Sequence, residues 1–139
     1  MPLPQGEEGM KKHKKRQAVV AVIKKNDKFL FIQRSGKVHS AQGYWCPVSG
    51  KIEDNETQEE ALKREVREEV GLDIVATKKV CVIPSRNKQF LLHFWEAEIV
   101  SGEAYIASDE ITDVTWVTIA EMKKLYPVFE EDIAVFETL

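Results

Sequence analysis

The sequence has few of the residues from which disulfide scaffolds and histidine metal centres are built. Its 139 residues include two cysteines and three histidines, and the histidines show no spacing typical of metal ligands. Cys46 and Cys81 each lie in an apolar stretch, so we expect two buried thiols rather than a disulfide or a nucleophile. Free thiols are typical of a reducing compartment, and we therefore expect a cytoplasmic location.

Long apolar runs are also absent. No run approaches the roughly 20 residues that a membrane-spanning helix needs, so no membrane partner is expected. Residues 1–16 contain no apolar segment between their charges and a cleavage site, and we do not expect a secretory signal there. With 43% apolar and 31% charged residues, the composition is that of a single globular domain.

Positive charge is concentrated near the N-terminus. Residues 1–16 hold five Lys or Arg and two acids, whereas the remaining residues hold 15 bases and 21 acids. We expect the basic segment to be a flexible, solvated tail, although such a run can also bind RNA, a membrane surface or an import receptor. The domain would then span residues 17–139, and its acidic character argues against nucleic acid as a partner.

Strand-like and helical segments alternate along the chain. Runs rich in β-branched and aromatic residues predict strands over residues 17–24, 28–34, 44–48, 73–84, 88–100 and 113–118. Thr57 and Glu60 form a capping box and Gly71 a stop signal, which predicts a helix over Thr57–Val70. Residues 50–55 are predicted to be a loop, and two shorter helices are predicted over residues 119–126 and 130–139. This order indicates an α/β sandwich with a mixed sheet.

The predicted helix carries two stripes of side chains. At about 100° per residue, Leu62, Val66 and Val70 share one face, which should be buried. An acidic stripe runs beside that face and consists of Glu65, Glu68 and Glu69. A solvated helix face would account for these acids, but converging carboxylates also suit a hard divalent cation such as Mg²⁺. Such a cation would let an acidic cleft accept a phosphate substrate.

The residues around the helix decide between these interpretations. They have the spacing of a complete Nudix box, and the matching positions are Gly50, Glu56, Arg64, Glu65, Glu68, Glu69 and Gly71. The chain therefore resembles the Nudix hydrolase family. The strands before the box and the later segment "EITDVTWV" are similar as well, so that the resemblance spans most of residues 17–139. It implies an α/β/α sandwich with a mixed sheet.

The resemblance also implies a metal site. The Gly50 carbonyl, Glu65 and Glu69 would bind Mg²⁺, with Mn²⁺ as a substitute, and Glu68 would contribute to the same ion or to a second one. Arg64 would orient these carboxylates by pairing with them. The glycine fits this role because its backbone can approach a cation without a side chain in the way.

The implied reaction is attack of water on a phosphorus atom of a nucleotide. The general base would be a box glutamate or an acid of a later loop, for which we prefer Glu110 over Asp109. We expect the substrate to contact Arg34, His39, Trp45 and Glu130. Trp45 could stack on a base or simply pack in the core. Glu130 and the acids that follow it, Glu131 and Asp132, could bind a purine edge or only favour a helix N-terminus.

Several functions are compatible with this resemblance. The main one is a Mg²⁺-dependent pyrophosphohydrolase acting on a nucleoside triphosphate or on a small molecule linked to a nucleoside diphosphate. A narrower alternative is a nucleotide-pool sanitising enzyme that removes oxidised purine triphosphates. A non-catalytic nucleotide sensor is the alternative from another class, although such modules usually lose box acids that are all present here. An RNA-processing role that uses the basic tail, and a homodimer, are left open.

Overall fold

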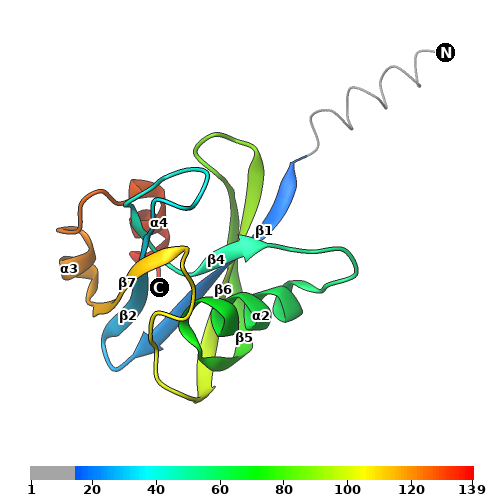
Figure 1. Cartoon of the computed structure of the whole chain (residues 1–139), viewed down its shortest axis with the longest axis horizontal. Coiled ribbons are helices and arrows are strands. Elements are labelled where there is room, and N and C mark those ends of the chain that lie inside the picture. The colour runs from blue at the N-terminus through cyan, green and yellow to red at the C-terminus, as the bar shows by residue number, and fades with distance from the viewer. Residues whose placement is uncertain (1–14) are drawn as a thin grey trace.

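The computed structural model describes residues 15–139, which form a sheet-rich fold with three helices (Figure 1). Most of the predicted basic tail lies outside the described residues. The strands are β1 (Arg16–Lys25), β2 (Lys28–Arg34), β3 (Trp45–Cys46), β4 (Ser49–Lys51), β5 (Asp73–Pro84), β6 (Phe90–Ser101) and β7 (Ile111–Val117). The helices are α2 (Gln58–Val70), α3 (Ile119–Met122) and α4 (Glu130–Phe136).

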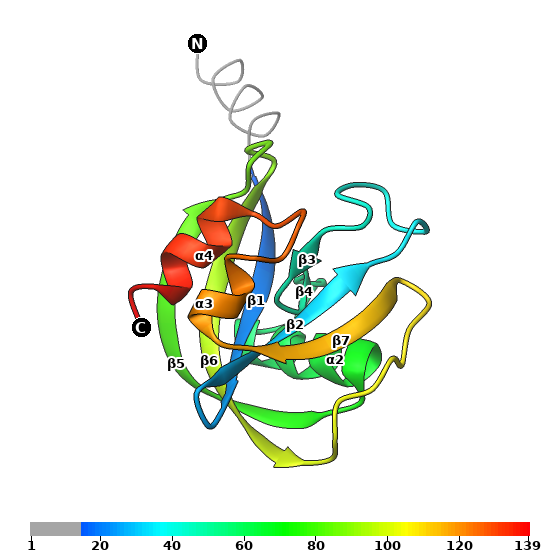
Figure 2. The same ribbon diagram turned by 90° about the vertical axis from the view of Figure 1, so that its left-hand side faces the viewer.

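Strands β1 and β2 form a hairpin that opens soon after its turn. The two strands pair only beside the turn, where Lys24 faces Phe29 and Lys25 faces Lys28. Beyond that point β1 pairs with β4 and β6, while β2 pairs with β3 and β7. Figure 2 shows the two strands diverging, with β3 and β4 between them. The β1–β6 pair is parallel and the others are antiparallel, which confirms the predicted mixed sheet.

Helix α2 begins and ends as the sequence predicts. The Thr57 hydroxyl accepts a hydrogen bond from the Glu60 backbone N–H at 3.1 Å, and the Glu60 carboxylate accepts one from the Thr57 N–H at 2.9 Å. Gly71 follows the last turn with a φ of 72°. Its N–H donates to the carbonyl oxygen of Arg67 at 3.1 Å. Both ends of the helix are therefore fixed by local interactions that satisfy otherwise unpaired backbone groups.

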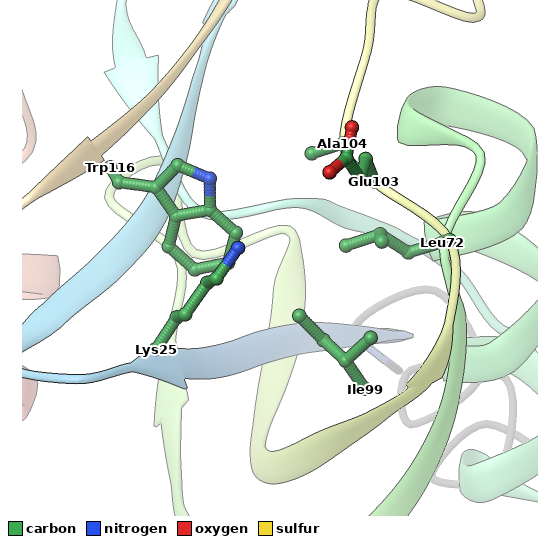
Figure 3. Close-up of a pocket in the computed structure, with 7 residues that line it drawn as sticks. Lys25, Leu72, Ile99, Glu103, Ala104 and Trp116 are labelled. Atoms are coloured by element: carbon green, nitrogen blue, oxygen red, sulfur yellow. The ribbon is translucent and has the colours of Figure 1, made fainter.

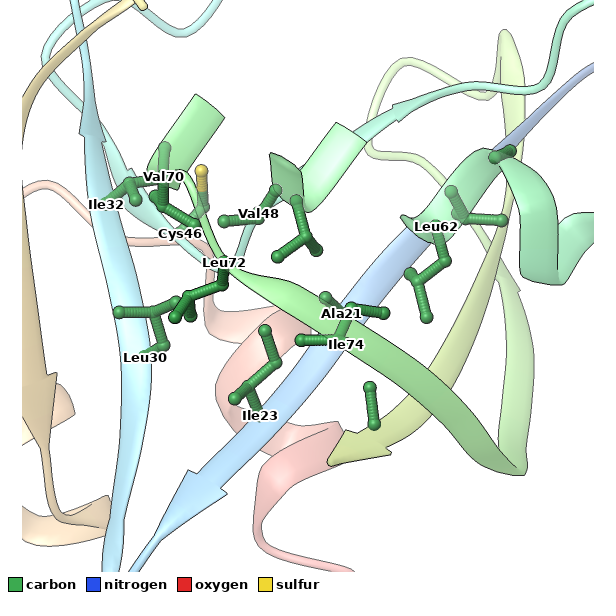
Figure 4. Close-up of a cluster of buried hydrophobic side chains, with 14 of the residues drawn as sticks. Ala21, Ile23, Leu30, Ile32, Cys46, Val48, Leu62, Val70, Leu72 and Ile74 are labelled. Carbon is green, nitrogen blue, oxygen red and sulfur yellow. The ribbon is translucent and has the colours of Figure 1, made fainter. Parts of the chain in front are cut away.

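The two faces of β1 are covered by different helices. Ala21 belongs to a buried cluster with Leu62 of α2, which Figure 4 shows in close-up. The adjacent Val20 points the other way and belongs to a cluster with Phe136 of α4. All four side chains are at most 3% exposed. Because successive residues of a strand face opposite sides, this alternation builds the α/β/α layers that the sequence predicted.

The structure departs from the prediction at Gly50. Residues 50–55 were predicted to be a loop, but Ser49–Lys51 forms strand β4, in which Gly50 pairs with Val19 of β1. Three residues are too few for alternating hydrophobicity to indicate a strand. The pairing depends instead on the divergence of β2, which leaves this edge of β1 without a partner.

The C-terminal helices are shorter than predicted. The segment at residues 119–126 is helical only over Ile119–Met122, and the segment at residues 130–139 only over Glu130–Phe136. Pro127 lies between them and disfavours helical geometry in the residue before it. Within residues 15–139, no helix is long and apolar enough to cross a membrane.

We predict that Gly71→Ala destabilises the fold. The positive φ at this position should cost alanine about 1 to 2 kcal/mol. A Cβ would also meet the Tyr105 ring, although that side chain is 59% exposed and can move aside. Gly36→Ala is the matched control, since a Cβ there meets nothing within 4 Å and its φ is not positive. Chemical denaturation should show a lower free energy of unfolding for the first variant alone, and equal values for the two would contradict the prediction.

Candidate active site

Strand β4 brings Gly50 against helix α2. The carboxylate of Glu65 occupies the space that a Cβ on Gly50 would need, so a side chain at this position would displace that carboxylate. Gly50 is held there by its pairing with Val19 of β1, while Glu65 is held by a helix packed on the same strand. Two box residues that are fifteen positions apart in the printed sequence are thus in direct contact.

Arg64 connects the box carboxylates to one another. Its Nε and Nη2 donate to the two oxygens of Glu56 at 2.6 and 2.9 Å, and its Nη1 donates to Glu65 at 2.8 Å. Nη2 also donates to the Lys51 carbonyl at 2.9 Å, which ties α2 to β4. The guanidinium lowers the pKa of Glu56, and this two-bond pairing is geometrically specific. The predicted pairing of Arg64 with the acids is present in the structure.

Two acids of the stripe face inward and disfavour each other's charge. Glu69 is only 8% exposed, and its pKa is raised to about 7 by burial and then by the charges of Glu65 and Glu110. The positive charge of Arg34 lowers the pKa of Glu69. The pKa of Glu65 is raised chiefly by burial. Glu65, Glu69, Glu110 and Arg34 are therefore close enough to interact, and the excess negative charge among them favours a cation.

The third acid of the stripe is placed differently. The side chain of Glu68 is 58% exposed, and its carboxylate lies 3.3 Å from Nη1 of Arg64. The side chain of Glu65, by comparison, is 15% exposed. At the 100° step of a helix, Glu68 points more toward solvent than Glu65 and Glu69. The structure thus separates an inner pair of carboxylates from an outer one.

The chemistry of these groups fits a hard divalent cation, which takes oxygen ligands and often keeps water molecules. The donors are the carboxylates of Glu65 and Glu69 and the backbone oxygen of Gly50. Within residues 15–139 no three Asp, Glu, His or Cys side chains converge, as they stand, tightly enough to hold an ion. One reason is that a Glu65 oxygen is engaged by Arg64. We therefore infer the fit from donor chemistry and burial, not from a formed cage.

The loop that carries Glu110 is attached at both ends. Near its start, the N–H groups of Tyr105 and Ala107 donate to the carbonyls of Val70 and Glu69 at 3.1 and 3.0 Å, at the end of α2. At its far end, Ser35 donates from its hydroxyl to Asp109 O and from its N–H to Glu110 O, each at 2.8 Å. The backbone of Glu110 is thereby fixed opposite Glu69. Ser35, which is 6% exposed, was not identified from the sequence.

The four predicted substrate contacts occupy different environments. Arg34 ends β2 and acts electrostatically on Glu69, so it lies with the acids. His39 is exposed in the loop after β2, and Glu130 is exposed at the start of α4. Trp45 is half-buried and packs against the core cluster around Phe136. Of the four, only Arg34 is brought to the acidic stripe by interactions within the described residues.

Asp132 is the acid of α4 that faces the interior. It is 7% exposed. Burial, and then the charge of Glu131, raise its pKa to about 7. Asp132 lies three and four residues before Val135 and Phe136, so the apolar face of the helix could have revealed its orientation. Of the three acids that begin this helix, we predicted Glu130 as the substrate contact, and it is about 160° away from Asp132 around the helix axis.

Cys46 lies between the two acidic regions. Burial, and then the charge of Asp132, raise the pKa of its thiol to about 12, and the charges of Arg34 and Glu69 also reach it. A thiol that stays protonated is a poor nucleophile, which agrees with its interpretation as a buried core residue. Its position shows that Asp132 and the acidic stripe border the same region, between β3 and the ends of α2 and α4.

A separate hollow of about 190 Å³ lies where β1 and β7 end, at Lys25 and Trp116 (Figure 3). It is lined by Lys25, Leu72, Ile99, Gly102, Glu103, Ala104 and Trp116. The ammonium group of Lys25 lies over the Trp116 ring, 5.8 Å from its centre. None of the predicted site residues lines this hollow, and it is distinct from the acidic region.

A family model described as the NUDIX domain matches residues 14–139, and the chain belongs to the Nudix family. Together with relatives that are named as pyrophosphohydrolases, this match identifies a hydrolase that acts on pyrophosphate bonds. The resemblance drawn from the box is thereby confirmed. Among solved structures, a MutT NUDIX hydrolase from Burkholderia pseudomallei has a TM-score of 0.76 at 23% identity, covering 89% of this chain and 97% of that one. This likeness confirms the fold.

Three curated relatives differ in how much of their length is matched. The CTP pyrophosphohydrolase of Escherichia coli (strain K12) is 27% identical over 121 residues, which cover 87% of this chain and 88% of that protein. The 8-oxo-dGTP diphosphatase of Proteus vulgaris is 42% identical over 97 residues, covering 65% and 86%. An NAD-capped RNA hydrolase of Pseudomonas aeruginosa is 31% identical over 111 residues, covering 78% of this chain but 38% of that protein.

The buried carboxyl of Asp132 predicts a pH-dependent stability. Its pKa is raised from 3.8 to about 7, so the folded protein binds this proton more tightly than the unfolded chain does. The contribution of Asp132 to the free energy of unfolding should therefore fall as the pH rises across that window. Asp132→Asn has no carboxyl to ionise at this position. The difference in free energy of unfolding between this variant and the wild type should therefore change in favour of the variant by on the order of 2 to 4 kcal/mol between pH 4 and pH 8.

The measurement is chemical denaturation of both proteins across this pH range. Glu130→Gln is the control, because Glu130 is an exposed acid of the same helix turn and should leave the wild-type profile unchanged. Parallel profiles for Asp132→Asn and the wild type would contradict the prediction.

Proposed function

We propose that this chain is a Mg²⁺-dependent pyrophosphohydrolase of small nucleotides, with nucleoside triphosphates as its main substrates. The observation that carries the proposal is the inner pair, Glu65 and Glu69, buried beside Gly50 with Glu110 close enough to raise their pKa values. Burying carboxylates that repel each other is unfavourable unless a cation joins them. A cation at that position would also bind the phosphate groups of a substrate.

The proposed metal ligands are the Gly50 carbonyl, Glu65 and Glu69, with Glu68 at the outer edge. When bound, Mg²⁺ would neutralise charge on the phosphates and make a water molecule a better nucleophile; Mn²⁺ would substitute for it. Arg64 would keep Glu65 oriented through the bonds that it shares with Glu56. The contact between Gly50 and the Glu65 carboxylate supports this assignment, because it places a backbone segment and a carboxylate side by side.

The remaining residues of the region would act on the substrate and the water. Arg34 would bind a phosphate, since its charge lies near the inner pair. Glu110 is the proposed general base, because the two bonds from Ser35 and the attachment of its loop to α2 hold its backbone near Glu69. His39 lies on the exposed loop after Arg34, from which it could also reach a phosphate. All these groups come from a single chain, so the proposal requires no dimer.

Asp132 replaces Glu130 as the proposed contact to the base. Glu130 is exposed, whereas Asp132 is buried and acts electrostatically on Cys46, which Glu69 of the acidic stripe also reaches. The Tyr44 and Phe129 rings stack 4.5 Å apart, and the Phe129 carbonyl accepts a hydrogen bond from the Asp132 N–H at 3.1 Å. We propose that these two rings line the base site.

The choice of triphosphates follows from the coverage of the relatives. The two relatives that are matched over 86–88% of their own length are named for CTP and for 8-oxo-dGTP. The relative named for NAD-capped RNA is matched over only 38% of its length. The oxidised-purine activity is therefore the second candidate, supported by the 42% identity to the 8-oxo-dGTP diphosphatase. The two free cysteines support a cytoplasmic location.

A substrate panel with Mg²⁺ tests this proposal and separates its alternatives. The panel contains CTP, dGTP, 8-oxo-dGTP, ADP-ribose and NAD, with product analysis in ¹⁸O-labelled water. Release of a monophosphate and pyrophosphate from the triphosphates is expected, and the label identifies the phosphorus that is attacked. Faster cleavage of ADP-ribose or NAD would favour a diphosphate-linked substrate. Tight binding without turnover of any compound would favour the nucleotide sensor.

We predict that Glu69→Gln retains the fold but lowers kcat/KM at least about a hundredfold, because it removes a charged metal ligand. Glu59→Gln is the matched control: Glu59 is exposed on the same helix and takes no part in the proposed site. Circular dichroism should show that both variants are folded, and titration should show weaker Mg²⁺ uptake by Glu69→Gln alone. A folded Glu69→Gln protein with near-normal turnover would exclude the proposed metal site.

A further inference from the structure

A stack of planar groups joins three segments that are distant in the sequence. The guanidinium of Arg86, at the tip of the β5–β6 hairpin, lies over the Phe129 ring at 5.1 Å from its centre. The Phe129 ring is in turn stacked on Tyr44, with ring centres 4.5 Å apart and an angle of 27° between the planes. Arg86 also donates to both carboxylate oxygens of Glu131, at 3.0 and 2.7 Å. We call Arg86, Phe129, Tyr44 and Glu131 the hairpin clasp.

The clasp holds the start of helix α4. Phe129 is the N-cap residue of this helix, and its side chain makes no capping hydrogen bond. The two bonds from Arg86 to Glu131, in the first turn, therefore restrain a helix end that lacks the usual side-chain cap. Asp132 is the next residue along the chain, and the charges of Arg86 and Glu131 both reach it.

The clasp also reaches the strand that leads to the phosphate-binding region. Tyr44 lies directly before β3, and its carbonyl oxygen accepts a hydrogen bond from the Arg34 N–H at 2.8 Å. The next residue, Trp45, donates its N–H to the Pro127 carbonyl at 2.9 Å, which joins β3 to the segment before α4. A shift of Arg86 would thus change how Tyr44 and Asp132 lie relative to each other.

We propose that Arg86 is a positioning residue for the nucleobase. Through the hairpin clasp it fixes the stacked rings of Tyr44 and Phe129, and it fixes the start of α4, where Asp132 lies. This inference rests on the proposed nucleotide hydrolase function and deepens it. Arg86 is half-exposed and lies outside the acidic stripe, so it acts on the base end of the substrate and not on the phosphates. Its effect should appear as a change in affinity for the nucleotide.

The test compares four variants in steady-state hydrolysis of the preferred triphosphate. Arg86→Ala removes both the contact with Phe129 and the bonds to Glu131. Arg86→Lys keeps the charge but loses the planar stack and the paired bonds, and Glu131→Gln keeps the stack but loses the ion pair. Lys88→Ala is the control, because it removes a positive charge from the same hairpin without touching the clasp. The readouts are KM, kcat, melting temperature, and inhibition by inorganic tripolyphosphate, which has no base.

For Arg86→Ala we expect KM to rise at least about fivefold and kcat to stay within about twofold, as for lost positioning of a remote substrate group. Arg86→Lys and Glu131→Gln should lie between this variant and the wild type. Inhibition by tripolyphosphate and the behaviour of Lys88→Ala should be unchanged. Rescue by Arg86→Lys to the full wild-type KM would mean that charge alone matters, and would overturn the stacking part of the proposal.

Two results would overturn the role of Arg86 while leaving the proposed function intact. One is an unchanged KM in Arg86→Ala, and the other is an equal loss of nucleotide and tripolyphosphate affinity, which would indicate a general effect on charge. Binding of a non-hydrolysable triphosphate analogue, followed by tryptophan fluorescence, separates this case from failure of the enzyme assignment. If the wild-type protein binds the analogue but cleaves no nucleotide, the hydrolase function is wrong, and the affinities of wild type and Arg86→Ala for the analogue still test the role of Arg86. If the wild-type protein does not bind the analogue, both the proposed function and the role of Arg86 are wrong.

Discussion

The contact between the Glu65 carboxylate and the Gly50 backbone is the constraint on which the active-site region depends. It requires β4 to pair with β1 and α2 to pack on the same strand, so that a helix and a strand meet without a side chain between them. The divergence of β1 and β2 provides the edge to which β4 binds. The glycine permits this close approach, since a Cβ would displace the carboxylate from its position.

The same arrangement stores unfavourable electrostatics. Glu69 is almost fully buried beside Glu65, and the raised pKa of both carboxyls shows that the folded protein disfavours their charges when no cation is present. Arg64 compensates only one side, because its bonds reach Glu56 and Glu65 but not Glu69. The inner pair destabilises the fold, whereas the two apolar clusters around β1 stabilise it, with about 2 kcal/mol from the burial of each large side chain. Such a compromise is common where a site must bind a charged ligand.

How far the sequence predicted this structure depended on the range of the interactions involved. Helix α2, its caps and its apolar stripe depend on residues three and four positions apart, and they were predicted to the residue. The acidic stripe was predicted as one group, whereas Glu68 is more exposed than Glu65 and Glu69. The short strand β4 was missed because its pairing depends on the distant β1. Ser35 and Arg86 were missed for the same reason, since their partners lie 74 and 45 residues away. Asp132 is a different case, because the apolar face of α4 contains a local signal that was not used.

The opening of one hairpin can account for both halves of the proposed site. Strand β1 leads through β4 to the inner carboxylates, and strand β2 leads through β3 to Cys46, Tyr44 and the start of α4. The charges of Asp132 and Glu69 both affect the pKa of the Cys46 thiol, so the two halves lie within electrostatic reach of the same buried side chain. In the proposed function, a nucleotide would lie along β3 with its phosphates at Glu69 and its base at Asp132. Specificity could then change at the clasp without disturbing the inner carboxylates, because the two halves belong to different strands of the opened hairpin.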